Sequence, residues 1–310
     1  MTQAGNPSSF GIDRRDLIAA GLGAAALSAG LARAHAQAPA SGAAAPGSAA
    51  GPGRVIVEQR GAVLLIGIDR PQTRNLLDPA IIIGLGKALY RAEQDNELRV
   101  VVLHGTGADF CMGIDPPAFI AAVQAGIIPV KDPEYIGLLG LAPPLRTKPL
   151  VIAVQGGTQF AGHELFLAAD IRIAASDTLF RQAEVTRGTF PGGGATVRFP
   201  REAGWGNAMR FMLTGDTWGA EDSRRMGLVQ EVTEPGKQLD VAVALATKIA
   251  AAAPLGVRAT LASSRQALAD GETTALAAAQ PVFTRLQQSE DFKEFQRSLR
   301  EGRAPVFRGI

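Results

Sequence analysis

Two glutamates lie twenty residues apart in this chain, each beside a run of small residues. Glu164 stands at the end of the small-residue stretch 156–162, and Glu184 stands ahead of the Pro/Gly run 191–194. Small residues let backbone approach a ligand closely, and two carboxyl groups can divide acid and base work at one carbon atom while amides hold a developing negative charge. The pair therefore suggests proton transfer in a shared site, provided that the fold brings the two side chains together.

The composition is that of a globular chain without metal-binding character. The 310 residues are 46% hydrophobic and carry a formal net charge of +2. This allows one large domain or two small ones with a substantial core. The near balance of charge argues against a nucleic-acid surface, which needs a clustered basic excess. A single cysteine, Cys111, excludes internal disulfides, and with only three histidines we expect no metal site.

The N-terminus has the pattern of an export signal. Arg14-Arg15 precede the Ala/Gly/Leu-rich run 17–32, and small residues suited to cleavage follow at Ala34-His35-Ala36. The run is too short and too weakly apolar for a stable membrane span, and residues 1–36 resemble a twin-arginine signal. We therefore expect a periplasmic or otherwise exported protein. The alternatives are a disordered tail or an interfacial helix at the N-terminus, and a cytoplasmic location. Residues 37–53, almost all Ala, Gly, Pro and Ser, predict a flexible linker.

The remainder of the chain alternates strand and helix patterns. Apolar runs around Arg60-Gly61 predict a hairpin, and Asp78-Pro79 has the cap-and-proline pattern that begins a helix, here to about Asp95. Strands that repeatedly precede helices predict an α/β domain over residues 54–310. The expected strands are 55–57, 63–68, 99–104, 150–155 and 171–174, and the further helices are 162–169, 202–213, 220–226, 241–253 and 255–268.

Five segments of this domain follow one another in a recognisable order. They are Ile68 to Pro71 with Arg74-Asn75-Leu76, Phe110 to Asp115, Gly156 to Leu165, Phe180 to Thr196, and Trp218 to Asp222 with Gly227-Leu228-Val229. In order and spacing they resemble the enoyl-CoA hydratase/isomerase (crotonase) family. The resemblance implies a crotonase-like α/β fold, with a spiral of ββα units over residues 54–240. It also implies C-terminal helices over residues 241–310 that mediate assembly into a trimer or hexamer.

The same resemblance implies a site. Family members bind acyl-CoA thioesters and hold the thioester oxygen with two backbone amides, an oxyanion hole that matches the N–H groups of Ile114 and Ala161 here. Glu164 and Glu184 match the two catalytic glutamates of the hydratases. Glycine is usual at the position of Ala161, so this alanine requires an ordinary φ.

Residues around these groups match the substrate-binding segments of the family. Relatives hold the adenine and pantetheine of CoA mainly through backbone atoms of the first such segment. CoA is part of the substrate, so the resemblance implies no separate cofactor. Pro116-Pro117 departs from the helix-starting sequence common at that point of the family. The matching residues are Arg74, Asn75, Leu76, Gly113, Asp115, Gly162, Pro191 and Gly192.

Retention of both glutamates favours hydration of a 2-enoyl-CoA, because relatives with other outcomes often replace one of them. Isomerase, acyl-CoA hydrolase and C–C lyase chemistry are alternatives, as is an exported binding protein that has lost turnover. His163 is expected to pack rather than act as a base beside Glu164, since adjacent helical residues point about 100° apart. Cys111 is expected to fill space, and no Gly-x-Ser-x-Gly motif supports a serine hydrolase.

Overall fold

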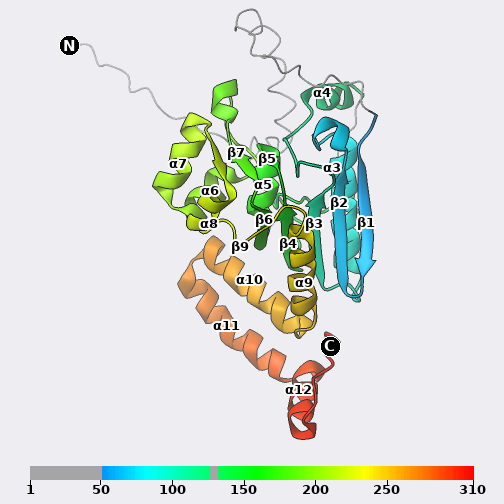
Figure 1. Cartoon of the computed structure of the whole chain (residues 1–310). Helices are drawn as coiled ribbons and strands as arrows, with labels where there is room; N and C mark the ends of the chain where they lie inside the picture. Colours follow the sequence, from blue (N-terminus) through cyan, green and yellow to red (C-terminus); the bar gives the residue numbers. More distant parts are fainter. Residues whose placement is uncertain (1–50, 126–131) are drawn as a thin grey trace, which may run out of the picture.

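The computed structural model describes residues 51–125 and 132–310 (Figure 1). The expected export signal, residues 1–36, and most of the expected linker, residues 37–50, lie outside the described residues. The end of that linker is held against the domain. The Gly53 amide donates to Asp78 Oδ2 at 2.7 Å, and the Gly51 carbonyl accepts from the Arg70 side chain.

A six-stranded sheet runs through the centre of the molecule. Its first pair is an antiparallel hairpin that turns between Arg60 and Val63, which confirms the predicted hairpin. The remaining strands pair in parallel, and their apolar runs are buried because helices cover both faces. In sheet order the strands are β1 (Arg54–Arg60), β2 (Val63–Asp69), β3 (Val100–Gly105), β4 (Leu150–Val154), β6 (Ile171–Ala175) and β9 (Glu231–Thr233).

A second, three-stranded sheet carries the segments that hold both glutamates. Its strands are β5 (Gly157–Gln159), β7 (Leu179–Arg181) and β8 (Thr217–Gly219), in the order β5-β7-β8. β5 and β7 are parallel, with Gln159 opposite Arg181. Because parallel strands end at the same edge of a sheet, the segments that follow β5 and β7 emerge side by side. The sequence pattern did not predict these strands, which are three residues long.

Prolines suited to the first helical turn begin two helices of the body. Helix α3 (Pro79–Gln94) starts behind Asp78, whose Oδ1 accepts from the Ile81 amide at 2.8 Å. The prolines at 116 and 117 begin helix α4 (Pro116–Gln124), since proline fits the first helical turn. The remaining helices on the body are α5 (Ala161–Ala168), α6 (Ala195–Ala203), α7 (Trp205–Thr214), α8 (Ala220–Arg225) and α9 (Gln238–Ala250).

One predicted helix is wrong. The single helix expected over 202–213 is two helices, α6 and α7, divided at Gly204. Gly204 has φ 82°, a left-handed conformation that ends α6 and that glycine adopts without the steric cost of a side chain. The helical pattern continues across the break because both helices bury apolar residues on the same core, so periodicity alone conceals the boundary.

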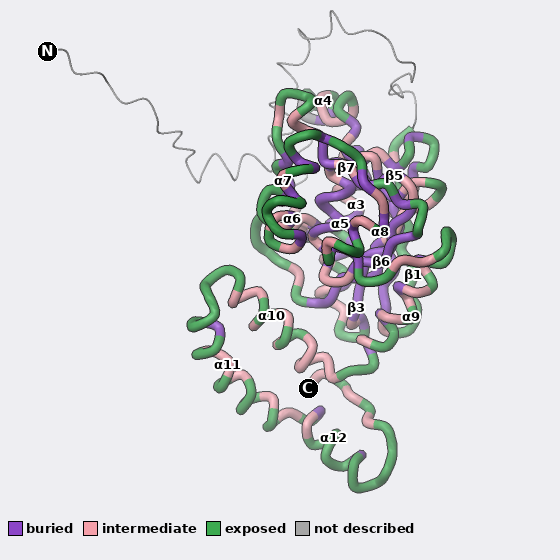
Figure 2. The backbone as a smooth tube through the Cα atoms, turned by 60° about the vertical axis from the view of Figure 1, so that its left-hand side comes forward, coloured by how far each residue is buried: buried purple, intermediate pink, exposed green. Residues whose placement is uncertain are grey.

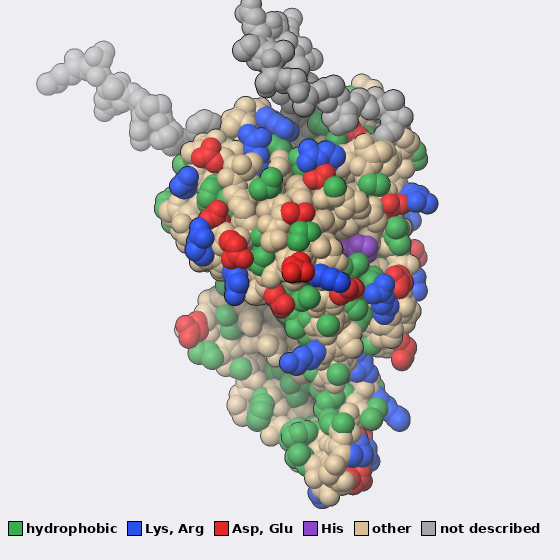
Figure 3. Space-filling model, in the orientation of Figure 1, with side chains coloured by type: hydrophobic (Ala, Val, Ile, Leu, Met, Phe, Trp, Pro, Cys, Tyr) green, Lys and Arg blue, Asp and Glu red, His purple; other side chains and the backbone are tan. Residues whose placement is uncertain are grey.

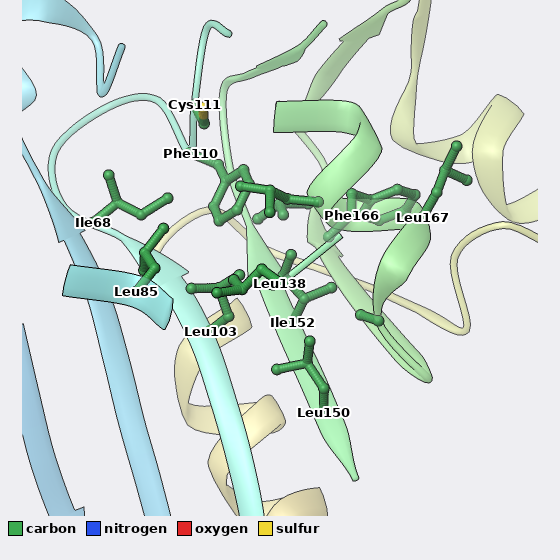
Figure 4. Packing of buried hydrophobic residues seen from close by; sticks show 14 of the residues in the cluster. Ile68, Leu85, Leu103, Phe110, Cys111, Leu138, Leu150, Ile152, Phe166 and Leu167 are labelled. Atoms are coloured by element: carbon green, nitrogen blue, oxygen red, sulfur yellow. The ribbon is translucent and has the colours of Figure 1, made fainter. Parts of the chain in front are cut away.

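The hydrophobic core lies on both faces of the large sheet. On one face, aromatic and aliphatic side chains from β2, β3, β4 and α5 interlock around Phe110 and Phe166 (Figure 4). On the other face, α9 packs Ala242, Ala246 and Ala250 against side chains of β2 and β3. The sequence placed the boundary between the spiral core and the C-terminal helices at residues 240 and 241, which lie inside α9. The side chains that α9 packs against the sheet extend to Ala250.

Three C-terminal helices project from this body as an arm (Figures 1 and 2). They are α10 (Pro254–Asp270), α11 (Glu272–Gln287) and α12 (Glu290–Glu301), of which only the first was predicted. Arg265 ties α10 to the body through Asp170, with 3.0 Å between Nη2 and Oδ1. The arm leaves large apolar side chains exposed, among them Leu276 and Phe283. An unpartnered apolar face of this kind marks an interaction surface.

The surface in Figure 3 mixes basic and acidic side chains over the body, without a region of one sign. This agrees with the near-neutral composition. Within residues 51–125 and 132–310, no single helix has the length and apolarity needed to cross a membrane. The pair α9 and α10 meets those criteria only when taken together, and the two are bent by 106° to each other.

Candidate active site

The parallel pairing of β5 and β7 brings Glu164 and Glu184 into one site. Glu164 lies in the first turn of α5, directly after β5, and Glu184 begins the 3₁₀ turn η3 (Glu184–Arg187), three residues after β7. Burial and then the neighbouring Glu184 charge raise the pKa of Glu164 to about 7. Burial also raises the pKa of Glu184. Two adjacent carboxyl groups that resist ionisation retain one proton between them near neutral pH.

Backbone amides at the start of α6 hold the Glu164 carboxyl group in place. The Ala195 N–H donates to Oε1 at 3.3 Å, and the Gly193 N–H also donates to this carboxylate. Both amides lower the pKa of Glu164 and so partly oppose burial. A β-carbon at Gly193 would lie only 2.3 Å from Oε2 of Glu164. With any other residue at this position, the Glu164 carboxyl group would have to move away from the backbone of this loop.

A side chain holds Glu184. The Gln182 amide donates from Nε2 to Oε1 of Glu184 at 2.7 Å, which lowers the pKa of Glu184 against the effect of burial. The other oxygen, Oε2, is buried and has no hydrogen-bond partner among the described residues. Gln182 in turn contacts His163, whose Nδ1 lies 2.5 Å from Oε1 of Gln182. Glu184 thus presents one occupied and one free carboxyl oxygen.

The two amides expected to form an oxyanion hole also lie next to each other. The segment that begins at Cys111 pairs with β5: Cys111 N–H donates to Gly157 O at 3.1 Å, and Gln159 N–H donates to Cys111 O at 2.9 Å. Because the two segments run parallel, Ile114 and Ala161 follow at the same edge. Within the described residues, neither of their N–H groups has a hydrogen-bond acceptor. Both residues are partly exposed.

Close packing of glycines sets the distance between these two segments. A β-carbon at Gly162 would lie 2.3 Å from the Cys111 carbonyl oxygen, and one at Gly113 would lie 3.0 Å from Cβ of Phe160. Gly113 has φ 105°, whereas Ala161 has the ordinary φ that its methyl group requires. The positive φ falls instead on Phe160, at 53°. Such a conformation in a bulky residue is costly and is found where a site demands it.

The expected substrate-binding side chains mostly hold the local backbone. Arg74 makes a bidentate pair with Asp109 at 2.8 and 3.0 Å. Asn75 is fully buried and bonds the backbone of Arg70 as well as two carbonyls, and Asp115 pairs with the buried Arg70 at 2.7 Å. The backbone N–H groups of Arg74 and Asn75 also bond within the loop, to the carbonyls of Pro71 and Arg70. A substrate-binding role for Arg74, Asn75 and Asp115 stays a prediction.

The remaining expected contacts differ in accessibility. Leu76 is partly exposed, and its carbonyl accepts from Arg70 at 3.3 Å. Pro191 is buried, and Gly192 is exposed on the loop that leads to α6. Gly193 in this loop, rather than Gly192, contacts Glu164. The glycine run predicted a close backbone approach, but only the fold identifies which glycine makes it.

Two other candidates from the sequence, Cys111 and His163, are uncharged at neutral pH. Burial raises the pKa of Cys111 to about 12, so its thiol remains protonated, and Sγ accepts from the Gly113 amide at 3.5 Å. Burial lowers the pKa of His163 to about 4, so this imidazole is neutral at neutral pH. Among the described residues, no group of three or more His, Cys, Asp or Glu is arranged to hold a metal ion.

The sequence did not single out Gln182, Gly193 or Ala195. Gln182 is two residues from Glu184 in the printed sequence, but nothing in its type or spacing marks it as a donor to that carboxylate. Ala195 has no functional side chain, and its contribution is a backbone N–H at the start of a helix. Backbone donors of this kind can be identified only from the folded structure. The glycine run indicates only that backbone comes close to another group at this point.

Comparison with known proteins identifies the family of this chain. The profile of the enoyl-CoA hydratase/isomerase family matches residues 58–309. The chain belongs to this family. Its α/β core with C-terminal helices is the crotonase-like fold that the motifs predicted. A solved structure of a probable enoyl-CoA hydratase/isomerase from Mycobacterium abscessus superposes with a TM-score of 0.79 and 41% identity, covering 83% of this chain and 98% of that one.

The similarity between this chain and two named relatives extends over nearly the whole length of each relative. The enoyl-CoA hydratase EchA19 of Mycobacterium tuberculosis is 33% identical over 256 residues, which are 81% of this chain and 95% of that protein. The (E)-benzylidenesuccinyl-CoA hydratase of Thauera aromatica is 34% identical over 266 residues, 82% of this chain and 99% of that protein. The family match over residues 58–309 includes every residue of the site described above.

The raised pKa of Glu164 predicts a specific pH dependence of stability. The native carboxyl group keeps its proton from its ordinary pKa of 4.5 up to about 7, whereas the unfolded chain releases it. Stability therefore falls as pH rises through this window, by on the order of 3 kcal/mol. Glu164→Gln removes the titration. We expect it to match the native protein near pH 5 and to exceed its free energy of unfolding near pH 8, measured by urea denaturation.

The exposed Glu97→Gln is the matched control and should follow the native protein at both pH values. A Glu164→Gln stability difference that stays the same between the two pH values would contradict the raised pKa.

Proposed function

We propose that this protein is an enoyl-CoA hydratase that adds water across the C2=C3 double bond of a 2-enoyl-CoA thioester. The observation that carries the proposal is the pair of adjacent glutamates that retains one proton beside two free backbone donors. Hydration needs one group that takes a proton from water and another that gives one to carbon. The names of the relatives above, both hydratases, support the same reaction.

In the proposed reaction, the thioester oxygen accepts hydrogen bonds from the N–H groups of Ile114 and Ala161. The Ala161 amide lies at the N-terminus of α5, where the helix dipole adds to the stabilisation of the enolate. Each such donor contributes about 3 kcal/mol to the barrier difference. The reaction needs no separate cofactor, because CoA is part of the substrate and water is the second reactant.

The glutamates hold the reacting water in this proposal. The ionised carboxylate of the pair takes one proton from the water as its oxygen bonds to C3. The protonated partner delivers a hydrogen to C2 as the enolate collapses. The pair thereby begins and ends with one proton, which moves from one member to the other. This exchange explains why two carboxyl groups with raised pKa values are needed rather than one.

We expect the purified protein to hydrate crotonyl-CoA or a longer 2-enoyl-CoA, and Glu184→Gln to lower kcat by about a thousandfold, because an amide cannot take or give the proton. Loss of the thioester's conjugated absorbance measures the rate, and mass spectrometry measures the product, which gains one water. Glu97→Gln serves as the matched control, since it makes the same chemical change at an exposed residue in the turn between α3 and β3.

Two outcomes of this experiment would overturn the proposal. Equal turnover by the native protein and Glu184→Gln would remove the acid and base role of the pair. A product of unchanged mass would assign isomerisation, and release of free CoA or of a shorter acyl chain would assign hydrolysis or C–C cleavage.

We also propose that the chain assembles as a trimer or hexamer through its C-terminal arm. The arm leaves Leu276, Phe283 and Leu299 exposed, with 65%, 56% and 66% of their surface accessible. Side chains of this size on neighbouring helices form an apolar surface that a second copy of the chain can bury. The proposed occupant is therefore the same protein, arranged with cyclic symmetry.

Charge placed on this surface should break the assembly. We expect light scattering to give three or six times the chain mass for the native protein, and the mass of one chain for the double variant Leu276→Glu/Phe283→Glu. The exposed Gln59→Glu, on β1, adds negative charge away from the arm and should leave the mass unchanged. A native protein that remains a single chain at micromolar concentration would contradict the proposed assembly.

A further inference from the structure

His163 is a buried polar residue that the proposed reaction does not use directly. It follows Gly162 in α5 and precedes Glu164, yet its ring lies within an aromatic cluster rather than in the site. The ring centroids of Phe199 and Trp218 lie 5.2 and 5.1 Å from it, and those of Phe166 and Phe180 lie 5.7 and 5.8 Å from it. The imidazole is fully buried. A polar ring in such surroundings needs a reason to be retained.

Within the described residues, the His163 side chain makes one hydrogen bond, to Gln182, which in turn bonds Glu184. Nδ1 of His163 lies 2.5 Å from Oε1 of Gln182, and Nε2 of Gln182 donates to Oε1 of Glu184 at 2.7 Å. Gln182 is itself fully buried. A continuous chain of side chains therefore runs from the aromatic cluster to the Glu184 carboxyl group.

The chemistry of the groups fixes the direction of each bond. An ionised carboxylate only accepts, so the NH₂ end of Gln182 must face Glu184. The carbonyl end then faces His163 and can only accept, so His163 must carry its proton on Nδ1. The other ring nitrogen, Nε2, has no hydrogen-bond partner among the described residues, in accord with this tautomer.

This direction decides which oxygen of Glu184 is free to react. Oε1 is occupied by the Gln182 donor, whereas Oε2 has no partner within the described chain. We propose that His163 is a positioning residue that holds the Gln182 amide in one orientation and thereby reserves Oε2 of Glu184 for proton exchange with the substrate. The inference rests on the proposed hydratase reaction for its kinetic readout, but the hydrogen-bond chain exists independently of the reaction.

Loss of the His163 donor frees the Gln182 amide to turn. Its carbonyl is left buried without a partner, which is costly, and nothing then holds the amide in the orientation that donates to Glu184. A weaker donor stabilises the ionised carboxylate less, so the pKa of Glu184 rises. The other charged groups that face Glu184 are Glu164 of α5 and Arg187 of its own turn, and Arg172 faces His163. None of these changes with the substitution.

The test compares three variants by kcat, KM and the pH dependence of kcat with crotonyl-CoA. His163→Phe fills the aromatic cluster without a donor, and we expect about tenfold lower kcat, little change in KM, and a pH profile displaced to higher pH. His163→Asn places a side-chain N–H at the position of Nδ1 and should restore the native profile. Phe199→Leu disturbs the same cluster without touching the hydrogen-bond chain, and its profile should coincide with the native one.

A His163→Phe profile that coincides with the native one, or one displaced equally in Phe199→Leu, would overturn the inference. Where His163→Phe fails to fold, His163→Leu takes its place with the same expectations. A second readout does not need turnover. The free energy that His163→Phe loses relative to the native protein should be larger near pH 8 than near pH 5, because Glu184 resists ionisation more strongly. Absence of hydration would therefore refute the proposed function while this readout still tests His163.

Discussion

The parallel hydrogen bonding between β5 and β7 is the contact on which the site depends. These strands are only three residues long, yet their pairing places the start of α5 beside the turn that begins at Glu184. The Cys111 segment adds to the other edge of β5 and brings the Ile114 amide to the Ala161 amide. One short strand thus fixes the positions of both glutamates and both donors relative to one another.

The cost of burying two carboxyl groups together gives this arrangement its chemistry. Two adjacent charges in a partly desolvated site repel each other, so one proton is retained and can be exchanged. Hydrogen-bond donors reduce the free-energy cost of ionising these buried carboxyl groups without removing it. The amides of Gly193 and Ala195 donate to Glu164, and the side chain of Gln182 donates to Glu184. The Gln182 donor occupies one oxygen of Glu184 and leaves the other, Oε2, without a partner among the described residues.

The sequence predicted the long elements and the family, and the fold supplied the finer parts of the site. Asp78-Pro79 and the apolar strands carry strong local signals, so the hairpin, α3 and the longer strands were predictable. The three-residue strands are too short for periodicity, and Gly204 breaks a helix whose two halves share one apolar pattern. Gln182 acts through a contact that depends on where β7 ends, which local sequence does not encode.

We infer that Glu164 and Glu184 hold one proton between them near neutral pH. Infrared difference spectroscopy of the native protein and its Glu164→Gln variant measures this directly, because a protonated carboxyl group has a carbonyl band that a carboxylate lacks. We expect one such band near pH 6 that disappears as pH rises through about 7 and is altered in Glu164→Gln. Two carboxyl groups that both ionise at their ordinary pKa, with no such band near pH 6, would contradict it.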